Sequence, residues 1–200
     1  MLLKSQLLPQ LFEGREVGDS LTVLDVGLAN PDTVTFLSRY RTRLHCLDLY
    51  SEPVLTLQES DAGQKELRDE FHQILNFPAH TEFDICLLWD FPNYLNQTAL
   101  RAFSEALMPW LSVNSLLHGF GIHKPGTVIS SCHYGVTSPT EISVRSGEAG
   151  DALYPHRQGE LSKEFRGLEV SRGTLLSNGK LEVLLKPEET LALKKANIFW

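Results

Sequence analysis

Short apolar runs alternate along this chain with segments whose apolar residues recur at helical spacing. A short, nearly continuous apolar run is typical of a strand that is buried on both faces of a sheet. Between two of these runs, residues 64–75 place Leu67, Phe71 and Ile74 on one face, which predicts a helix. Alternating strands and helices predict an α/β fold with parallel strands. The strands predicted in this way are residues 21–27, 44–49, 83–90 and 116–122.

Two asparagines mark the starts of further helices. Asn30 precedes Pro31, and an asparagine at the N-cap followed by proline at the first helical position is a helix-start signal. Asn96 precedes a segment that would bury Leu100 and Phe103 on one face. These signals predict one helix after the first strand and another after the strand at 83–90.

The last third of the chain has a different composition. Residues 124–150 are rich in Gly, Ser, Thr and Pro, with two short strand-like pieces, and we expect a loop insertion there. A short helix is expected over residues 161–165. An Asn-Gly pair separates two strand-like runs, 174–177 and 180–185, and this pair is the strongest short signal for a β-hairpin. The prediction is therefore a mixed sheet of six or seven strands that ends in an antiparallel hairpin.

Composition limits the classes of protein to which the chain can belong. Its 200 residues, 42% of them hydrophobic, suit one domain with a full core. With 18 basic and 25 acidic residues, the net charge of −7 argues against sequence-independent nucleic-acid binding. No apolar run approaches the ~20 residues of a membrane span, and three scattered cysteines do not form a disulfide or zinc framework. We therefore expect a single cytoplasmic domain over residues 1–200, without a metal site.

The two ends are expected to be extensions of this domain. Residues 1–20 begin with a Leu-rich stretch without a small-residue cleavage site, which predicts a helical lead and not a signal peptide. Residues 187–200 predict a weakly amphipathic tail that ends Ile-Phe-Trp. Because large apolar side chains are costly to expose, this tail either folds back over the domain or docks on a second protein or subunit.

The first candidate site lies where the first strand ends. Residues 23–27 read Val-Leu-Asp-Val-Gly, and the next helix begins within a few residues. A strand, a glycine at its end and a helix N-terminus form the usual nucleotide-binding crevice of open α/β sheets. Asp48 closes the second strand about twenty residues later, where a carboxylate can accept hydrogen bonds from both hydroxyls of a ribose.

With the closing hairpin, this order of motifs resembles the class I S-adenosylmethionine-dependent methyltransferases, over roughly residues 21–185. The resemblance implies a Rossmann-like fold and S-adenosylmethionine as the cofactor. It implies that Asp48 binds the ribose, and that Asp90, which borders the cofactor, and Tyr94 face the transferred methyl group. The residues that it implies for the methionine end are Asp25, Gly27 and Ala29.

The glycine loop diverges from the pattern of this family. The family usually has Gly-x-Gly-x-Gly, and the corresponding residues here are Gly27, Ala29 and Pro31. Ala29 adds a methyl group, and Pro31 has no N–H with which to donate to a ligand. An inactive methyltransferase-like module that binds a protein partner is therefore the alternative to an active transferase.

Weaker candidates complete the site. His118 could act as a base at the mouth, although a histidine in an apolar strand is more often structural. His133 and Tyr134, in the expected loop insertion, could contact a substrate. A dinucleotide-dependent oxidoreductase is a third alternative, but Pro31 and Asp32 oppose a pyrophosphate at the helix N-terminus. We expect methyl transfer from S-adenosylmethionine to an acceptor that is a small molecule or a protein.

Overall fold

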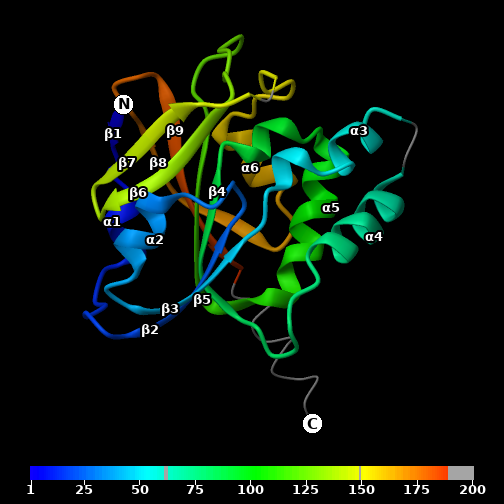
Figure 1. The fold of residues 1–200 in the computed structure, drawn as a ribbon. Helices are drawn as coiled ribbons and strands as arrows, with labels where there is room; N and C mark the ends of the chain where they lie inside the picture. Colours follow the sequence, from blue (N-terminus) through cyan, green and yellow to red (C-terminus); the bar gives the residue numbers. More distant parts are fainter. Residues whose placement is uncertain (61–62, 149, 189–200) are drawn as a thin grey trace.

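The main sheet has six strands in the order β3-β2-β4-β5-β9-β8 (Figure 1). The computed structural model describes residues 1–60, 63–148 and 150–188. The first four strands are parallel, whereas β9 pairs antiparallel with both β5 and β8. The predicted mixed sheet with an antiparallel hairpin at its end is confirmed. The strands are β2 (Ser20–Asp25), β3 (Arg41–Cys46), β4 (Phe83–Trp89), β5 (Leu111–Ile122), β8 (Leu168–Leu175) and β9 (Lys180–Pro187).

Helices lie on both faces of this sheet. α4 and α5 lie side by side on one face, and α1 and α2 lie on the other face (Figure 1). Right-handed crossovers explain this division, because the connection from β2 to β3 runs in the opposite direction to the connections that lead to β4 and β5. The helices are α1 (Leu8–Leu11), α2 (Pro31–Leu37), α3 (Val54–Leu57), α4 (Gln64–Ile74), α5 (Gln97–Leu107) and α6 (Gln158–Glu164), with 3-10 turns η1 (Leu49–Ser51), η2 (Phe91–Tyr94) and η3 (Met108–Trp110).

Both predicted asparagine caps are confirmed. The side chain of Asn30 accepts a hydrogen bond of 2.9 Å from the backbone N–H of Asp32, and α2 begins at Pro31. The side chain of Asn96 accepts one of 2.9 Å from the N–H of Ala99, and α5 begins at the next residue. Each cap satisfies a backbone N–H that has no partner within the helix.

A second sheet of three strands lies over α2. It consists of β1 (Leu2–Lys4), β7 (Glu141–Ser146) and β6 (Cys132–Ser138), and all its pairings are antiparallel. Two expectations from the sequence are corrected here. The N-terminal lead contains a strand as well as the short helix α1, and the expected loop at 124–150 contains two paired strands. β1 pairs with β7, which is far away in the sequence, so no local pattern shows it. β6 and β7 pair with each other as a local hairpin, in keeping with the two short strand-like pieces noted in this segment.

One continuous core joins the two sheets. It contains buried residues of the main sheet, such as Leu24 and Leu87, together with Leu3 and Val136 of the small sheet. In residues 1–60, 63–148 and 150–188, no helix combines the length and the apolar character that a bilayer crossing requires. Most of the predicted C-terminal tail, residues 189–200, lies outside the described residues.

Candidate functional site

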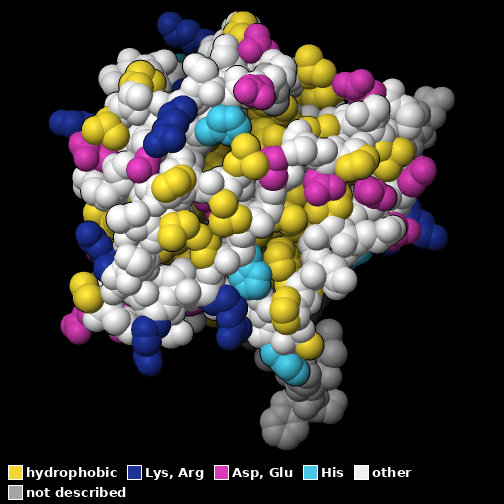
Figure 2. Space-filling view, viewed as in Figure 1, with side chains coloured by type: hydrophobic (Ala, Val, Ile, Leu, Met, Phe, Trp, Pro, Cys, Tyr) yellow, Lys and Arg dark blue, Asp and Glu magenta, His cyan; other side chains and the backbone are white. Residues whose placement is uncertain are grey.

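A cavity of about 340 Å³ opens at the carboxyl ends of β2, β3 and β4. Small-molecule sites in proteins typically enclose roughly 300–1,000 Å³. On the face shown in Figure 2, hydrophobic side chains are visible in a hollow that has acidic and histidine side chains beside it. Residues from both sheets line the cavity, namely Gly27, Leu28, Asp48, Tyr50, Ser51, Trp89, Ser131, Cys132, His133, Tyr134 and Glu148.

Gly27 and Asp48 lie in this cavity, as expected from the sequence. β2 and β3 are adjacent and parallel, so the residues that follow them reach the same edge of the sheet. Asp48 is half-buried, and its carboxylate accepts a hydrogen bond from the hydroxyl of Ser51. This carboxylate can accept further hydrogen bonds from a ligand in the cavity.

Asp25 forms the back of the site and does not line the cavity. It is fully buried, and its Oδ1 accepts hydrogen bonds from Gly27 N at 3.0 Å and from Trp89 Nε1 at 2.7 Å. Its Oδ2 has no hydrogen-bond partner among the described residues. Burial raises the pKa of Asp25 to about 7, although the hydrogen bonds from Trp89 and Gly27 oppose this change. Asp25 therefore shapes the loop at Gly27 and the position of the indole.

Two stacked aromatic rings form one wall. The Trp89 and Tyr134 rings lie 5.3 Å apart between centroids and are inclined by only 13°. Trp89 ends β4 with a φ of 50°, a left-handed conformation that is uncommon for an aromatic residue. Such a conformation costs on the order of 1–3 kcal/mol and persists when the surrounding contacts hold it. Here the hydrogen bond to Asp25 and the stacking on Tyr134 supply those contacts.

Asp90 lies behind this wall, where it is fully buried. Its Oδ1 accepts a hydrogen bond of 2.7 Å from the hydroxyl of Tyr50, and its Oδ2 accepts one of 2.6 Å from the hydroxyl of Tyr134. The Nζ of Lys180 lies 3.7 Å from Oδ2. Burial raises the pKa of Asp90, against the opposing effects of Lys180 and the two tyrosines. The structure therefore turns Asp90 away from the cavity, whereas the sequence suggests that it faces a methyl group.

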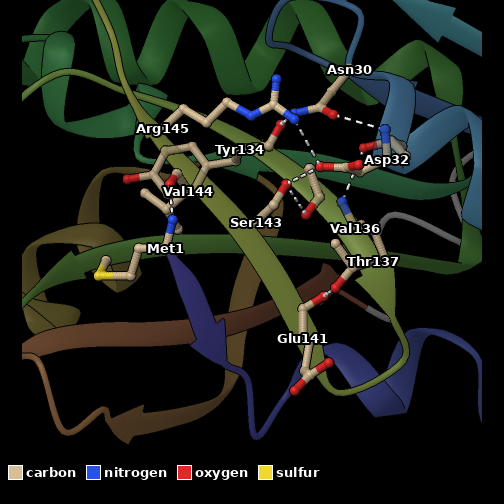
Figure 3. A network of polar contacts seen from close by, with 12 residues as sticks. Met1, Asn30, Asp32, Tyr134, Val136, Thr137, Glu141, Ser143, Val144 and Arg145 are labelled. Carbon is tan, nitrogen blue, oxygen red and sulfur yellow. Dashed lines mark hydrogen bonds and ion pairs between the residues drawn. The ribbon is translucent and has the colours of Figure 1, made fainter.

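The small sheet is fastened to the N-cap and the first turn of α2 (Figure 3). Asn30 Nδ2 donates to the carbonyl oxygen of Tyr134 at 2.8 Å, and Val136 N donates to Thr33 Oγ1 at 3.0 Å. Ser143 Oγ donates to Asp32 Oδ2 at 2.7 Å. Arg145, also on β7, forms an ion pair of 3.4 Å with the same oxygen. These contacts cover the N-terminus of α2, so the small sheet closes the crevice between β2 and α2 on this side.

Two more of the expected site residues, Ala29 and Tyr94, lie outside the cavity. Ala29 is exposed and does not line the cavity, because the loop turns outward before Asn30 caps α2. Tyr94 donates to the carbonyl oxygen of Gly150 at 3.1 Å and lines a separate hollow of about 220 Å³. Burial raises the pKa of Tyr94 to about 12. The mouth of the main cavity is formed by other residues.

His118 is also away from the mouth. It is fully buried, and its Nε2 lies 2.6 Å from Oε1 of Glu182, which is itself fully buried. Oε2 of Glu182 accepts hydrogen bonds from Gln6 N at 2.9 Å and Leu7 N at 3.1 Å. This pair fastens the N-terminal segment to the main sheet, and it corrects the expectation of a base at the cavity mouth.

His133 and Tyr134 do line the cavity, and several other lining residues were not expected from the sequence. Three of them, Tyr50, Ser51 and Trp89, lie within a few residues of Asp48 or Asp90. The predicted strand ends therefore indicate the segments from which these residues come. Glu148 has no such signal, because it comes from the segment that was expected to be a loop. In the described part of the chain, no group of three metal-ligating side chains lies close enough together to hold an ion.

Comparison with known proteins gives a likeness in fold. No protein-family model and no curated protein matches the sequence. A solved S-adenosylmethionine-dependent methyltransferase from Clostridium acetobutylicum is 16% identical, with coverage of 90% of this chain and 89% of that one and a TM-score of 0.50. The glycopeptide N-methyltransferase MtfA, solved with sinefungin, is 11% identical, with coverage of 90% and 85% and a TM-score of 0.50. Together with the strand order, these likenesses identify the fold as that of the class I methyltransferases.

Proposed function

We propose that the protein transfers a methyl group from S-adenosylmethionine to an acceptor that is a small molecule or a protein. The observation that supports this proposal is that Gly27 and Asp48, at the ends of adjacent parallel strands, line one cavity. A strand-end glycine and a strand-end carboxylate about twenty residues apart suit a ribose-bearing ligand. The cavity volume of about 340 Å³ is within the range that holds small molecules.

The residues present fit the nucleoside part of this cofactor. Asp48 would accept hydrogen bonds from ribose hydroxyls, and Gly27 leaves room for a close approach to the backbone. The Gly27 N–H is already bonded to Asp25, so the backbone at this position offers space but no free donor. When bound, S-adenosylmethionine supplies a methyl group on a positively charged sulfur.

The protein contributes position and exclusion of water to the reaction. Tyr50, Trp89 and Tyr134 form an aromatic lining that keeps solvent from the reacting groups. Burial and the Asp90 carboxylate raise the pKa of Tyr50 and of Tyr134 well above that of an ordinary phenol, so neither is a base near neutral pH. Alignment of donor and acceptor within about 3–3.5 Å then supplies the main rate effect.

Calorimetry with S-adenosylmethionine and S-adenosylhomocysteine tests this proposal. We expect micromolar or weaker binding, about −8 kcal/mol or less favourable. Asp48→Ala should weaken it by about 1.5–3 kcal/mol, the value typical of a hydrogen bond to a charged group. Asp69→Ala is the matched control, because Asp69 is an exposed aspartate on α4, outside the cavity.

A failure to bind S-adenosylmethionine and S-adenosylhomocysteine would contradict the proposal. If neither compound gives heat or a thermal shift at millimolar concentration, the proposal fails. The alternative of an inactive module that binds a protein partner would then take its place. Equal losses of affinity in the Asp48→Ala and Asp69→Ala variants would instead contradict the assignment of Asp48.

A further inference from the structure

Two rings of the cavity lining share one buried acceptor. The hydroxyls of Tyr50 and Tyr134 donate to the two different oxygens of Asp90, at 2.7 and 2.6 Å. Both tyrosines line the cavity, whereas Asp90 does not. We propose that Asp90 is a positioning residue that fixes the Tyr50 and Tyr134 rings in the cavity wall, with Lys180 as its counter-ion. This inference rests on the proposed function, which makes these rings part of a methyl-transfer site.

These two hydrogen bonds, here called the tether, join three parts of the fold that are far apart in the sequence. Tyr50 is in η1, Asp90 follows β4, and Tyr134 is in β6 of the small sheet. The two hydrogen bonds span 40 and 44 residues of sequence. Each bond uses one carboxylate oxygen, so the planar group sets the two hydroxyls at a fixed spacing. An unbranched apolar residue at position 90 would leave both hydroxyls buried without an acceptor.

Lys180 supplies the charge that a buried carboxylate needs. Its Nζ lies 3.7 Å from Asp90 Oδ2 and also contacts the Tyr134 hydroxyl. It lies 4.9 Å from the centroid of the Tyr134 ring, so the same cation is close to both the acceptor and the ring that the acceptor holds. Only 19% of the Lys180 side chain is exposed. A charge pair that is shielded from water in this way interacts more strongly than a surface pair.

The fluorescence of the Trp89 indole reports on the position of the Tyr134 ring without any ligand. Trp89 is stacked on Tyr134 and precedes Asp90 in the chain, so release of Tyr134 removes one neighbour of the indole. Replacing Trp110 and Trp200 by Phe leaves Trp89 as the only tryptophan, because the chain has three. Its emission maximum and its quenching by acrylamide then measure solvent access to this wall.

The experiment compares Asp90→Asn and Tyr134→Phe with Glu164→Gln in this background. Glu164 is the matched control, because it is another buried carboxylate with a basic partner, Arg101 at 2.5 Å, on an element outside the cavity lining. We expect Asp90→Asn and Tyr134→Phe to shift the emission to longer wavelength and to raise quenching. In the natural background, Asp90→Asn should weaken S-adenosylhomocysteine binding by about tenfold, because Tyr50 and Tyr134 would no longer be held in the cavity wall. Glu164→Gln should lower the melting temperature and leave emission, quenching and affinity unchanged.

Two results would overturn the inference. One is wild-type emission and quenching in a folded Asp90→Asn or Tyr134→Phe variant. The other is an equal change in Glu164→Gln, which would show general loosening. If Asp90→Asn does not fold, Tyr134→Phe still decides, because it removes a single oxygen. Absence of S-adenosylhomocysteine binding in the natural protein would contradict the proposed function alone, since the fluorescence comparison needs no ligand.

Discussion

Trp89 Nε1 donates a hydrogen bond of 2.7 Å to Oδ1 of Asp25, and both side chains are buried. The bond joins the end of β4 to the end of β2, its neighbour in the sheet. The same oxygen accepts from Gly27 N at 3.0 Å. One carboxylate oxygen therefore fixes both the turn of the glycine loop and the position of an aromatic ring in the cavity wall.

The first prediction concerns pH and Asp25. Burial raises its pKa from 3.8 to about 7 in the folded protein, while the hydrogen bonds from Trp89 and Gly27 act in the opposite direction. Between these two values the folded state binds more protons at this group than the unfolded state does. The contribution of Asp25 to stability is therefore fully present below pH 3.8 and is lost as the pH rises through 7.

Asp25→Asn tests this dependence, because asparagine keeps an acceptor for both hydrogen bonds and cannot ionise. We expect the stability of the variant relative to the natural protein to increase from pH 5 to pH 8, as measured by urea unfolding. The exposed Asp69→Asn variant should show no such trend. The same pH slope in Asp25→Asn and in the natural protein would contradict the prediction.

The second prediction concerns Asn30, which has two separate tasks. Its Oδ1 caps α2, and its Nδ2 holds the carbonyl of Tyr134 in the small sheet. Asn30→Ala removes both and should lower the free energy of unfolding by about 2–3 kcal/mol, the sum of a cap and a buried hydrogen bond. Asn30→Ser keeps a cap acceptor but has no amide donor for the Tyr134 carbonyl, so it should lose less. If chemical unfolding shows the same loss of unfolding free energy in both variants, the whole effect belongs to the hydrogen bond with the Tyr134 carbonyl.

The third prediction concerns the buried pair of His118 and Glu182. Burial acts to raise the pKa of Glu182, but the hydrogen bonds from His118, Ser5 and Gln6 outweigh it and hold this pKa below its ordinary value. Glu182→Ala leaves these donors unpaired inside the protein and should cost about 3–5 kcal/mol. Glu169→Ala, which breaks an exposed ion pair with Lys186 on the neighbouring strand, should cost at most about 1 kcal/mol. Similar melting temperatures for the two variants would contradict the structural role of the pair.

The fourth prediction concerns amide exchange in residues 124–146. The strands β6 and β7 are paired and fastened to α2, so their amides should be protected to a degree similar to those of β4. Residues 124–131 precede β6 and belong to no helix or strand, so they should exchange faster. Slowing of this exchange on addition of S-adenosylhomocysteine would identify residues 124–131 as the part that closes on the ligand. Fast exchange throughout β6 would contradict the fastened sheet.

The sequence pattern predicted the main sheet because its signals are local. The run that became β4 is continuous and apolar, and Asn30 and Asn96 each act on a backbone N–H two or three residues away. The addition of β1 to the small sheet could not be predicted in this way. Leu2 pairs with Ser143, and no local pattern contains information about a partner so far along the chain.

Of the candidate site, the residues at strand ends could be predicted, but the orientations of their side chains could not. Gly27 and Asp48 are at strand ends, so strand prediction alone brings them to one edge of the sheet. The orientation of a side chain at that edge depends on its tertiary contacts. Asp90 is at a strand end as well, but Tyr50, Tyr134 and Lys180 draw it inward, and two of these residues come from elements that follow it by more than forty positions.

The fastening of the first residues to late parts of the chain sets an order of folding during synthesis. β1 requires β7, and the backbone N–H groups of Gln6 and Leu7 require Glu182 of β9. Although this segment is synthesised before the main sheet, it reaches its native place only after β9 has been synthesised as well. At a translation rate of roughly 5–20 residues per second, its apolar side chains stay without native partners for about ten seconds or longer. For that interval the nascent chain exposes a leucine-rich segment on which a chaperone can act.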